Sequence, residues 1–236
     1  MESMTKIETP SDLTPSSPTL LSIQNDVREH FGWSEEDDVE SAIAMLRRVE
    51  DSTVETWARH NRAVSLSKIF RRVIIREARV AILGAAVEPE EIAAILDSPT
   101  LIVAADGAVG AISEMPDTLS EKAWSRVVCM VSDADGGVGT YQAVRRSIPF
   151  VLHAHGDNRE DWDHLLGLAE EQTNPPELIL THQTHNTIEG MHNPGGFTDG
   201  DRAACFLTAL GVSKENIKLL GTRSDIVGRW SGYTEE

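Results

Sequence analysis

The sequence predicts an α/β protein with a doubly wound, mostly parallel sheet of about six strands, helices on both faces, and a preceding N-terminal helical region. From Arg79 onward, short apolar runs alternate with segments of helical pattern. These runs are rich in Val, Ile and Leu and are apolar on both faces, which is typical of strands buried on both sides of a parallel sheet. Before Arg79 no convincing strand pattern appears.

The N-terminal part is predicted to be a tail followed by helices. Residues 1–22 are rich in Ser, Thr and Pro, and we expect them to be disordered. Residues 23–78 form the expected helical region, in which the stretch DDVESAIAMLRRV has helical apolar spacing. Ser34, with Asp37 three residues later, is expected to cap that helix. Residues 52–78 are expected to continue as helix.

The α/β domain, residues 79–236, is expected to hold the catalytic site. Its predicted strands are RVAILG, TLIVAAD, RVVCMVSD, PFVLHAH, ELILTHQ and NIKLLGT. The predicted crossover helices between them are PEEIAAIL, GAVGAISEM, GVGTYQAVRRS, REDWDHLLGLAEEQ and DGDRAACFLTAL. In an open sheet of this kind, ligands bind outside the carboxyl ends of the strands.

Composition excludes several classes of partner. The chain has 236 residues, is 40% hydrophobic and carries a net charge of −17, so we expect one sizeable core and no affinity for nucleic acid or anionic membranes. No apolar run approaches a membrane span of about 20 residues, and no secretory leader pattern is seen. Cys129 and Cys205 lie in apolar contexts and are expected to be buried, reduced thiols. We therefore expect a cytoplasmic protein with small-molecule substrates, and its oligomeric state is left open.

Aspartates follow several of the predicted strands. Asp106, Asp133, Asp135 and Asp157 come after strands, and Asp199 comes at the start of a helix. Gathered carboxylates repel one another unless a cation lies between them, and Mg²⁺ is the oxygen-seeking cation that combines with phosphates. Each aspartate taken alone could equally be a cap or turn residue.

The stretch HAHGDN, residues 153–158, resembles the zinc-hydrolase pattern H-x-H-x-D-H. A zinc site would use His153, His155 and Asp157 with one further histidine, drawn from His182, His185 and His192. The last position of the pattern is Asn158, which speaks against zinc. The favoured interpretation is that this stretch lines a substrate and phosphate site, while His185 and His192 lie on the surface.

The motifs SDADGG, HAHGDN, THQ and GGFTDGDRA resemble those of the archaeal 6-hydroxymethyl-7,8-dihydropterin pyrophosphokinase family. ADGA resembles the Asp-Gly segment of the thiamine pyrophosphokinases, with which that family shares its catalytic fold, and DIVGRWS is similar to the family's closing segment. The resemblance covers about residues 79–232 in motif order. It implies Mg²⁺-dependent transfer of diphosphate from ATP to the pterin's hydroxymethyl oxygen with release of AMP, in tetrahydromethanopterin or folate-type cofactor synthesis.

For such a reaction, individual residues are expected to have the following roles. The metal ligands expected are Asp133, Asp135 and Asp157. Catalytic roles are expected for His153, His155, Asp157 and Arg202. Nucleotide contacts are expected from Asp106, Gly107, Gly136 and Gly137. Pterin contacts are expected from Asn158, Gln183, Thr198, Asp199 and Asp201, which have suitable donors and acceptors.

One segment departs from the family. After the first strand the family has a Gly-rich turn, whereas this chain has Gly84-Ala85-Ala86-Val87-Glu88. No phosphate cradle is expected there, because Glu88 would oppose it, and nucleotide contacts are expected mainly from later loops. Three alternatives stay open: a thiamine diphosphokinase, a nucleotide-sugar transferase that binds Mn²⁺ through Asp133-x-Asp135, and a nucleotide-binding regulator without turnover.

Overall fold

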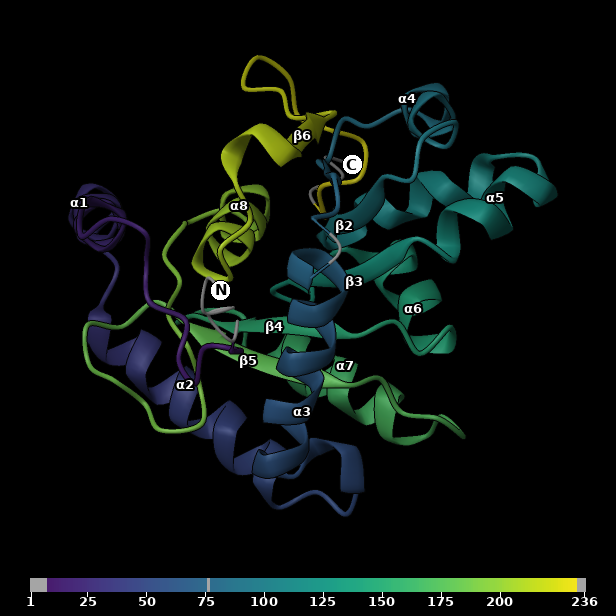
Figure 1. Ribbon diagram of the computed structural model, residues 1–236. Helices are drawn as coiled ribbons and strands as arrows, with labels where there is room; N and C mark the ends of the chain where they lie inside the picture. Colours follow the sequence, from purple (N-terminus) through teal and green to yellow (C-terminus); the bar gives the residue numbers. More distant parts are fainter. Residues whose placement is uncertain (1–7, 76, 233–236) are drawn as a thin grey trace, which may run out of the picture.

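The computed structural model describes residues 8–75 and 77–232, and it has the predicted α/β architecture (Figure 1). Six parallel strands form one sheet in the order β5-β4-β3-β2-β1-β6. Each of the six predicted runs contains a strand: β1 Val80–Leu83, β2 Leu101–Ala105, β3 Val127–Ser132, β4 Phe150–Ala154, β5 Leu178–His182 and β6 Ile217–Leu220. The predicted fold class is therefore confirmed.

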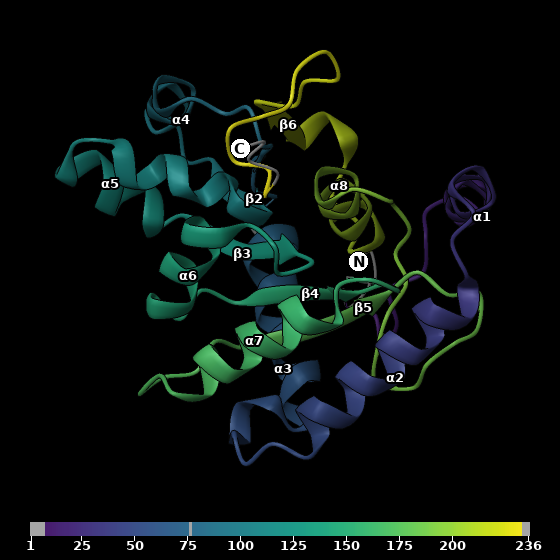
Figure 2. The same cartoon turned by 180° about the vertical axis from the view of Figure 1, so that it is seen from behind.

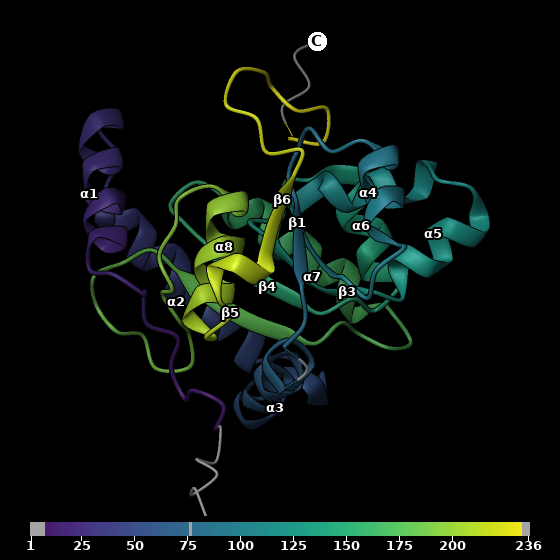
Figure 3. The ribbon, with the colours of Figure 1, turned by 45° about the horizontal axis from the view of Figure 1, so that its top comes forward.

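The order of the strands reverses at β1, because later strands are added on both of its sides. Successive strands from β1 to β5 are added on one side of β1, and β6 returns to pair with β1 on its other side. Figure 3 shows β1 and β6 side by side, with α8 (Asp199–Ala209) on one side of them and α4 (Pro89–Ile95) on the other. In open α/β sheets ligand sites form at such switch points, at the carboxyl ends of the strands.

Two apolar cores cover the two faces of the sheet. Alternate residues of each strand face opposite sides, so in β1 Ala81 and Leu83 belong to one core while Val80 and Ile82 belong to the other. The first core is closed mainly by α2 (Glu35–Glu50), α4, α5 (Asp117–Trp124), α6 (Gly137–Arg145) and α7 (Arg159–Glu170), and Figure 2 shows α6 and α7 in front of the sheet. The second core is closed by α8 and by α3 (Arg59–Phe70).

The N-terminal region is helical, as expected, but its helices begin earlier than predicted. Helix α1 spans Thr19–Phe31, so it starts before residue 23, and Leu13 is 1% exposed within the second core. The predicted disordered tail is thus wrong for the helical start and for Leu13, while its residues 1–7 lie outside the described part of the chain. Ser34 caps α2 as predicted, although its side chain accepts a hydrogen bond from the backbone of Glu36 rather than of Asp37.

Residues 52–75 follow the helical prediction with interruptions. A 3₁₀ turn, η1 (Glu55–Trp57), precedes α3, and a π-helical turn, η2 (Arg71–Ile75), follows it. The chain is extended at Ala58, between η1 and α3. Trp57 is fully buried in the first core, and its indole donates to the carbonyl of Pro176, which holds this segment to the sheet.

The segment after β2 is a 3₁₀ helix, η3 (Asp106–Glu114), where an α-helix was expected. Runs of 3₁₀ helix longer than three or four residues are uncommon. A Cβ atom added at Gly139 would lie 2.4 Å from the carbonyl oxygen of Gly107, so η3 and α6 approach closely because both carry glycine. The sequence pattern did not reveal α5 or the last short turn, η4 (Lys214–Asn216). No helix in the described residues is long and apolar enough to cross a membrane.

Candidate functional site

A cleft of about 1080 Å³ lies at the carboxyl ends of the strands. Residues at or just beyond the end of every strand line it, in chain order Gly84, Asp106, Asp133, His155, Gln183 and Gly221. Its further walls come from the loop before α2, from the start of α8 and from the segment that follows β6. The cleft therefore occupies the position that the sheet topology predicts for a ligand.

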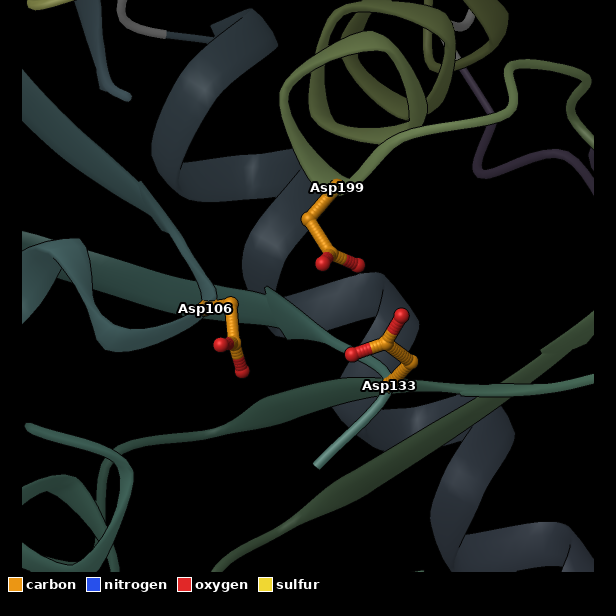
Figure 4. Close-up of side chains that lie close together, drawn as sticks. All are labelled: Asp106, Asp133 and Asp199. Carbon is orange, nitrogen blue, oxygen red and sulfur yellow. The ribbon is translucent and has the colours of Figure 1, made fainter. Parts of the chain in front are cut away.

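Three aspartates meet on the floor of this cleft. Asp106 follows β2, Asp133 follows β3 and Asp199 opens α8, and one carboxylate oxygen from each lies within 4.8 Å of the other two. Figure 4 shows the three carboxylates pointing into a shared space from three different elements. Asp199 belongs to this group, although it was expected to contact the pterin.

Local backbone conformation directs two of these side chains. Asp106 has a positive φ of 45°, and its Oδ1 accepts hydrogen bonds from the hydroxyls of Ser132 (2.6 Å) and Thr140 (3.4 Å). Ala134, just after Asp133, has a φ of 83°, and its backbone N–H donates to Ser132 Oγ. An alanine in this conformation costs about 1–3 kcal/mol, and such strain is concentrated at functional sites.

Arg202 supplies the positive charge closest to the carboxylates. It is 5% exposed, and its Nη1 lies 3.3 Å from Asp133 Oδ2 and 3.2 Å from Asp199 Oδ1. Its Nη2 donates to Gln183 Oε1 at 3.2 Å. The helical spacing of Asp199 and Arg202 on α8 places both at this point.

The carboxylates differ in their affinity for protons. Burial alone would raise the pKa of Asp133, but the hydrogen bond from His155 and the charge of Arg202 outweigh it and lower that pKa. Burial and the charge of Asp133 raise the pKa values of Asp106 and Asp199. Partial withdrawal from solvent and the charges of Asp133 and Asp106 raise the pKa of Asp135 to about 8. Asp133 thus binds a proton less readily than an isolated aspartate does, whereas Asp106, Asp199 and Asp135 bind one more readily.

The three-aspartate group fits a hard divalent cation. Asp133 Oδ1 is buried and has no hydrogen-bond partner among the described residues, which is costly unless the atom serves a ligand. Three carboxylate oxygens from Asp106, Asp133 and Asp199 form the oxygen-only donor set that Mg²⁺ prefers. Asp135 also lines the cleft, but it is not part of this group.

The two histidines of HAHGDN lie in different environments. His155 reaches the cleft, with Nε2 3.2 Å from Asp133 Oδ2 and Nδ1 2.6 Å from Asp157 Oδ1. His153 is 2% exposed and does not line the cleft, and its ring nitrogens face Thr181 Oγ1 and Gln183 Oε1. Burial and the charge of Arg202 hold the pKa of His153 well below its usual range, so the ring is neutral.

The last two residues of HAHGDN, Asp157 and Asn158, do not belong to the three-aspartate group. The side chain of Asp157 is 83% exposed and pairs with His155 at the rim of the cleft. Asn158 is 3% exposed and holds the ends of β3 and β4 together, since its amide donates to the carbonyls of Asp133 and His153 and accepts from the N–H of His155. Every polar atom of the Asn158 side chain is therefore occupied by protein.

The remaining predicted residues have mixed placements. Gly107 and Gly136 pack against each other, since a Cβ atom on Gly107 would lie 2.6 Å from the carbonyl oxygen of Gly136, and Gly137 has a positive φ of 58°. Thr198 lines the cleft and caps α8 by accepting from the N–H of Asp201. The exposed Asp201 is absent from the lining.

A buried polar network beside the cleft was not expected from the sequence. Asp38, 3% exposed, accepts hydrogen bonds from Arg28 Nη1 (3.1 Å), from the N–H of Gly156 (2.8 Å) and from Gln183 Nε2. Arg28 also donates to the carbonyl of Gln183 at 2.8 Å. A carboxylate one helical turn into an acidic segment carries no signal of burial in the sequence, so only the packing of α2 reveals it.

The turn after β1 also lines the cleft, together with the segment that follows β6. Trp230 is tied to this turn, because its N–H donates to Ala85 O and its indole to Val87 O. A Cβ atom on Gly228 would lie 2.2 Å from the carbonyl carbon of Ala85. Glu88 was expected to oppose an anion at this turn. Its side chain instead caps α4 and pairs with Arg229, and it does not line the cleft.

The histidines needed for a zinc site are dispersed. His182 is buried and bonds Thr184, His185 pairs with Glu35, and His192 pairs with Asp12. Among the described residues, the group that could hold a metal consists of aspartates alone. The geometry thus favours an oxygen-ligated cation over zinc.

Comparison with known proteins supports the resemblance seen in the motifs. The chain is 36% identical over 132 residues to a protein named 6-hydroxymethyl-7,8-dihydropterin pyrophosphokinase from Pyrococcus furiosus, a match that covers 55% of this chain and 48% of the relative. A protein of the same name from Methanothermobacter thermautotrophicus is 34% identical, with 58% of this chain and 52% of the relative covered. Another from Methanocaldococcus jannaschii is 28% identical, with 78% and 70% covered.

These matches have defined limits. The chain spans about half the length of the first two of these curated relatives. No family model matches the chain, and no solved structure matches it significantly. The expected resemblance to archaeal proteins of this name is confirmed.

Proposed function

We propose that the protein is a Mg²⁺-dependent diphosphokinase that transfers diphosphate from ATP to 6-hydroxymethyl-7,8-dihydropterin and releases AMP. The observation that carries this proposal is the meeting of Asp106, Asp133 and Asp199 with Arg202 in the cleft at the carboxyl ends of the strands. The names of the archaeal relatives support the choice of reaction and acceptor. The product would serve the synthesis of tetrahydromethanopterin or of a folate-type cofactor.

The reaction joins the hydroxymethyl oxygen of the pterin to the β-phosphorus of ATP. The bond between that phosphorus and the oxygen bridging it to the α-phosphorus breaks, AMP leaves with that oxygen, and the hydroxyl proton is lost. Such transfers depend on positioning and on neutralisation of charge more than on covalent chemistry by the protein.

The residues of the site have distinct tasks in this proposal. Asp106, Asp133 and Asp199 would hold Mg²⁺, which would neutralise charge on the phosphates. Arg202 keeps Asp133 ionised and adds positive charge beside the transferred group. His155, which contacts Asp133 and reaches the cleft, orients the attacking hydroxyl. His153 does not reach the cleft, and it positions Gln183 and Thr181 through its ring nitrogens.

Release of AMP from ATP and Mg²⁺ tests the proposal directly. We expect AMP only when 6-hydroxymethyl-7,8-dihydropterin is present, with no acceptor and thiamine as the two comparison reactions. AMP with thiamine alone would contradict the acceptor but not the chemistry. Measured ATP binding without AMP from either acceptor would contradict catalysis and favour a regulator, and turnover of a nucleotide sugar would favour the transferase alternative.

Binding of Mg²⁺ can be tested apart from turnover. A ligand that binds only the folded state stabilises it, by about 2.7 kcal/mol at a concentration of 100 Kd. We therefore expect Mg²⁺ to raise the Tm of the wild type, because it relieves repulsion among the aspartates. An equal rise in an Asp199→Asn variant would show that this group does not bind the metal.

A further inference from the structure

Three aromatic side chains stack at one end of the cleft. Phe31 and Trp33 have ring centroids 4.7 Å apart with planes inclined by 18°, and Trp33 and Phe197 have centroids 5.9 Å apart with planes inclined by 8°. Trp33 and Phe197 line the cleft. The two come from segments that are distant in sequence, and each directly precedes the capping residue of a helix, Ser34 of α2 and Thr198 of α8.

This stack is exposed to a degree that packing does not explain. Phe31 is 58% exposed and Trp33 is 50% exposed, and neither belongs to the two apolar cores. Exposed, clustered aromatic side chains at a cleft indicate a binding surface for a ligand or a partner. Parallel rings in particular suit a flat, aromatic ligand.

The aromatic end lies close to the proposed reaction centre. Phe197 is two residues before Asp199, so their Cα atoms are at most about 7 Å apart. A bicyclic ring stacked there carries a short hydroxymethyl arm that can reach the space shared by the three aspartates. The acceptor needs this arrangement, because its ring must bind while its hydroxyl meets the phosphates.

A free carboxylate lies in the same wall of the cleft. Asp37 lines it beside Gly156, and no described residue donates a hydrogen bond to its side chain. A 2-amino-4-oxo heterocycle presents an amino group and a ring N–H side by side, and a carboxylate can accept from both. Asp38, the next residue, is already occupied by Arg28, Gly156 and Gln183.

The opposite end of the cleft is lined mainly by glycine-containing turns and includes an arginine. It is formed by the turn at Gly84 and by the segment from Gly221 to Gly232, which includes Arg223. Its aromatic residue, Trp230, packs on Gly110 and donates to Val87 O. Close backbone and a cation suit a nucleotide better than they suit the acceptor ring.

We propose that Trp33 and Phe197 form the stacking platform for the heterocycle of the acceptor, that Asp37 accepts from its amino edge, and that ATP binds at the Gly84–Gly221 end. This inference rests on the proposed function, since it assigns the acceptor of that reaction to one end of the cleft. Trp33 is then a specificity-determining residue supplied by the N-terminal region.

Separate binding titrations of the two substrates test this assignment. The probes are 6-hydroxymethylpterin, the stable oxidised form of the acceptor, and a Mg²⁺ complex of an ATP analogue with a methylene group between the α- and β-phosphorus atoms. For Trp33→Ala we expect roughly 10-fold weaker pterin binding or more, because stacking on one aromatic ring has about this value. Affinity for the ATP analogue should change less than about 2-fold, and Trp33→Phe should restore most of the pterin affinity.

Asp37→Asn provides an independent measurement. It should weaken pterin binding and raise KM for the pterin, with little change in affinity for the ATP analogue. Val64→Ala removes a side chain that is 49% exposed and absent from the cleft lining, and serves as the control with both affinities unchanged. Circular dichroism verifies that each variant is folded.

Four results would overturn the assignment. The first is unchanged pterin binding in both Trp33→Ala and Asp37→Asn, and the second is loss of ATP-analogue affinity in place of pterin affinity. The third is a wild-type dimer that Trp33→Ala converts to a monomer without any change in pterin affinity, since the patch would then bind a second copy. The fourth is AMP release by the wild type in the presence of the pterin, combined with an affinity for 6-hydroxymethylpterin that is the same in Phe197→Ala and Trp33→Ala as in the wild type. Failure of the proposed function itself is distinct, because the wild type would then neither bind the pterin nor release AMP with it.

Discussion

Asp133 is held in place by His155, Arg202 and Asn158. Its Oδ2 faces His155 and Arg202, its carbonyl accepts from Asn158, and its Oδ1 is left without a partner. A carboxylate held in place from one side and unpaired on the other is arranged for a ligand on the unpaired side. The sequence indicated this residue from its place after a strand, but the free oxygen is a fact of the tertiary structure.

Asp133→Asn should reduce turnover by about 100-fold or more, because the substitution removes negative charge from the metal group and disturbs Arg202. The fold should be retained, since asparagine has nearly the same shape. AMP release in the presence of ATP, Mg²⁺ and pterin measures the effect. Asp163→Asn, on an exposed aspartate of α7, is the matched control and should keep full activity.

His182 should make the protein sensitive to acid. Burial and the charge of His192 lower the pKa of His182 to about 4, and its Nδ1 accepts from the N–H of Thr184. The folded state therefore resists protonation, so stability is complete above the unfolded pKa of about 6.5 and is lost as the pH falls from there to about 4. The full loss is about 3 kcal/mol.

Urea unfolding at several pH values measures this loss. In His182→Asn, whose side-chain oxygen can accept the same hydrogen bond from Thr184, we expect a shallower decline between pH 6.5 and 4. The decline should not vanish, since the pKa of His153 is lowered by burial as well. Equal slopes in the wild type and the variant would show that His182 is not the titrating group.

At the scale of elements, the strands could be predicted from the sequence, whereas the segments that form the walls of the cleft could not. Fully apolar runs such as RVVCMVSD predicted β3 correctly, because a strand covered on both faces excludes polar residues along its length. By contrast, η3 became a 3₁₀ helix where an α-helix was expected, since its glycines let it approach α6 more closely than pattern alone reveals. Helix α1 is joined to α2 by the buried ion pair between Arg28 and Asp38, which no apolar pattern indicates, whereas α2 packs on the sheet through apolar residues such as Met45 and Val49.

Arg28→Ala should test how α1 is held to α2 and β5. The substitution leaves the buried carboxylate of Asp38 without its ion-pair partner, which destabilises proteins by about 3–5 kcal/mol. Chemical denaturation measures the change in free energy of unfolding. Arg48→Ala, which removes a partly exposed pair with Glu170, should cost about 1 kcal/mol or less, and equal losses in the two variants would contradict a structural role for the buried pair.

At the scale of the whole molecule, the N-terminal region shares its core with the sheet. Met45, Val49 and Trp57 are fully buried in the same core as strand residues such as Phe150 and Leu180. The regions before and after residue 78 differ in their sequence pattern, but they share one apolar core.

A chain consisting of residues 79–236 should not fold independently. Removal of α2 and α3 would expose apolar residues on both faces of the sheet, and each large apolar side chain that becomes exposed costs about 1.5–3 kcal/mol. Thermal unfolding followed by circular dichroism should show no cooperative transition for this fragment. A transition with the Tm of the full chain would establish residues 79–236 as an autonomous domain.

The sequence by itself determined the fold class, the six strands and the rim on which polar residues gather. It did so because the period and composition of a strand depend on its own burial, and because parallel strands place their carboxyl ends at one edge. The tertiary structure decided which aspartates meet, brought Asp199 into the group and left Asp157 exposed at the rim. It also placed Asp38 and the Trp33–Phe197 pair at the cleft, since contacts between segments more than a hundred residues apart depend on how helices pack and leave no periodic signal in the chain.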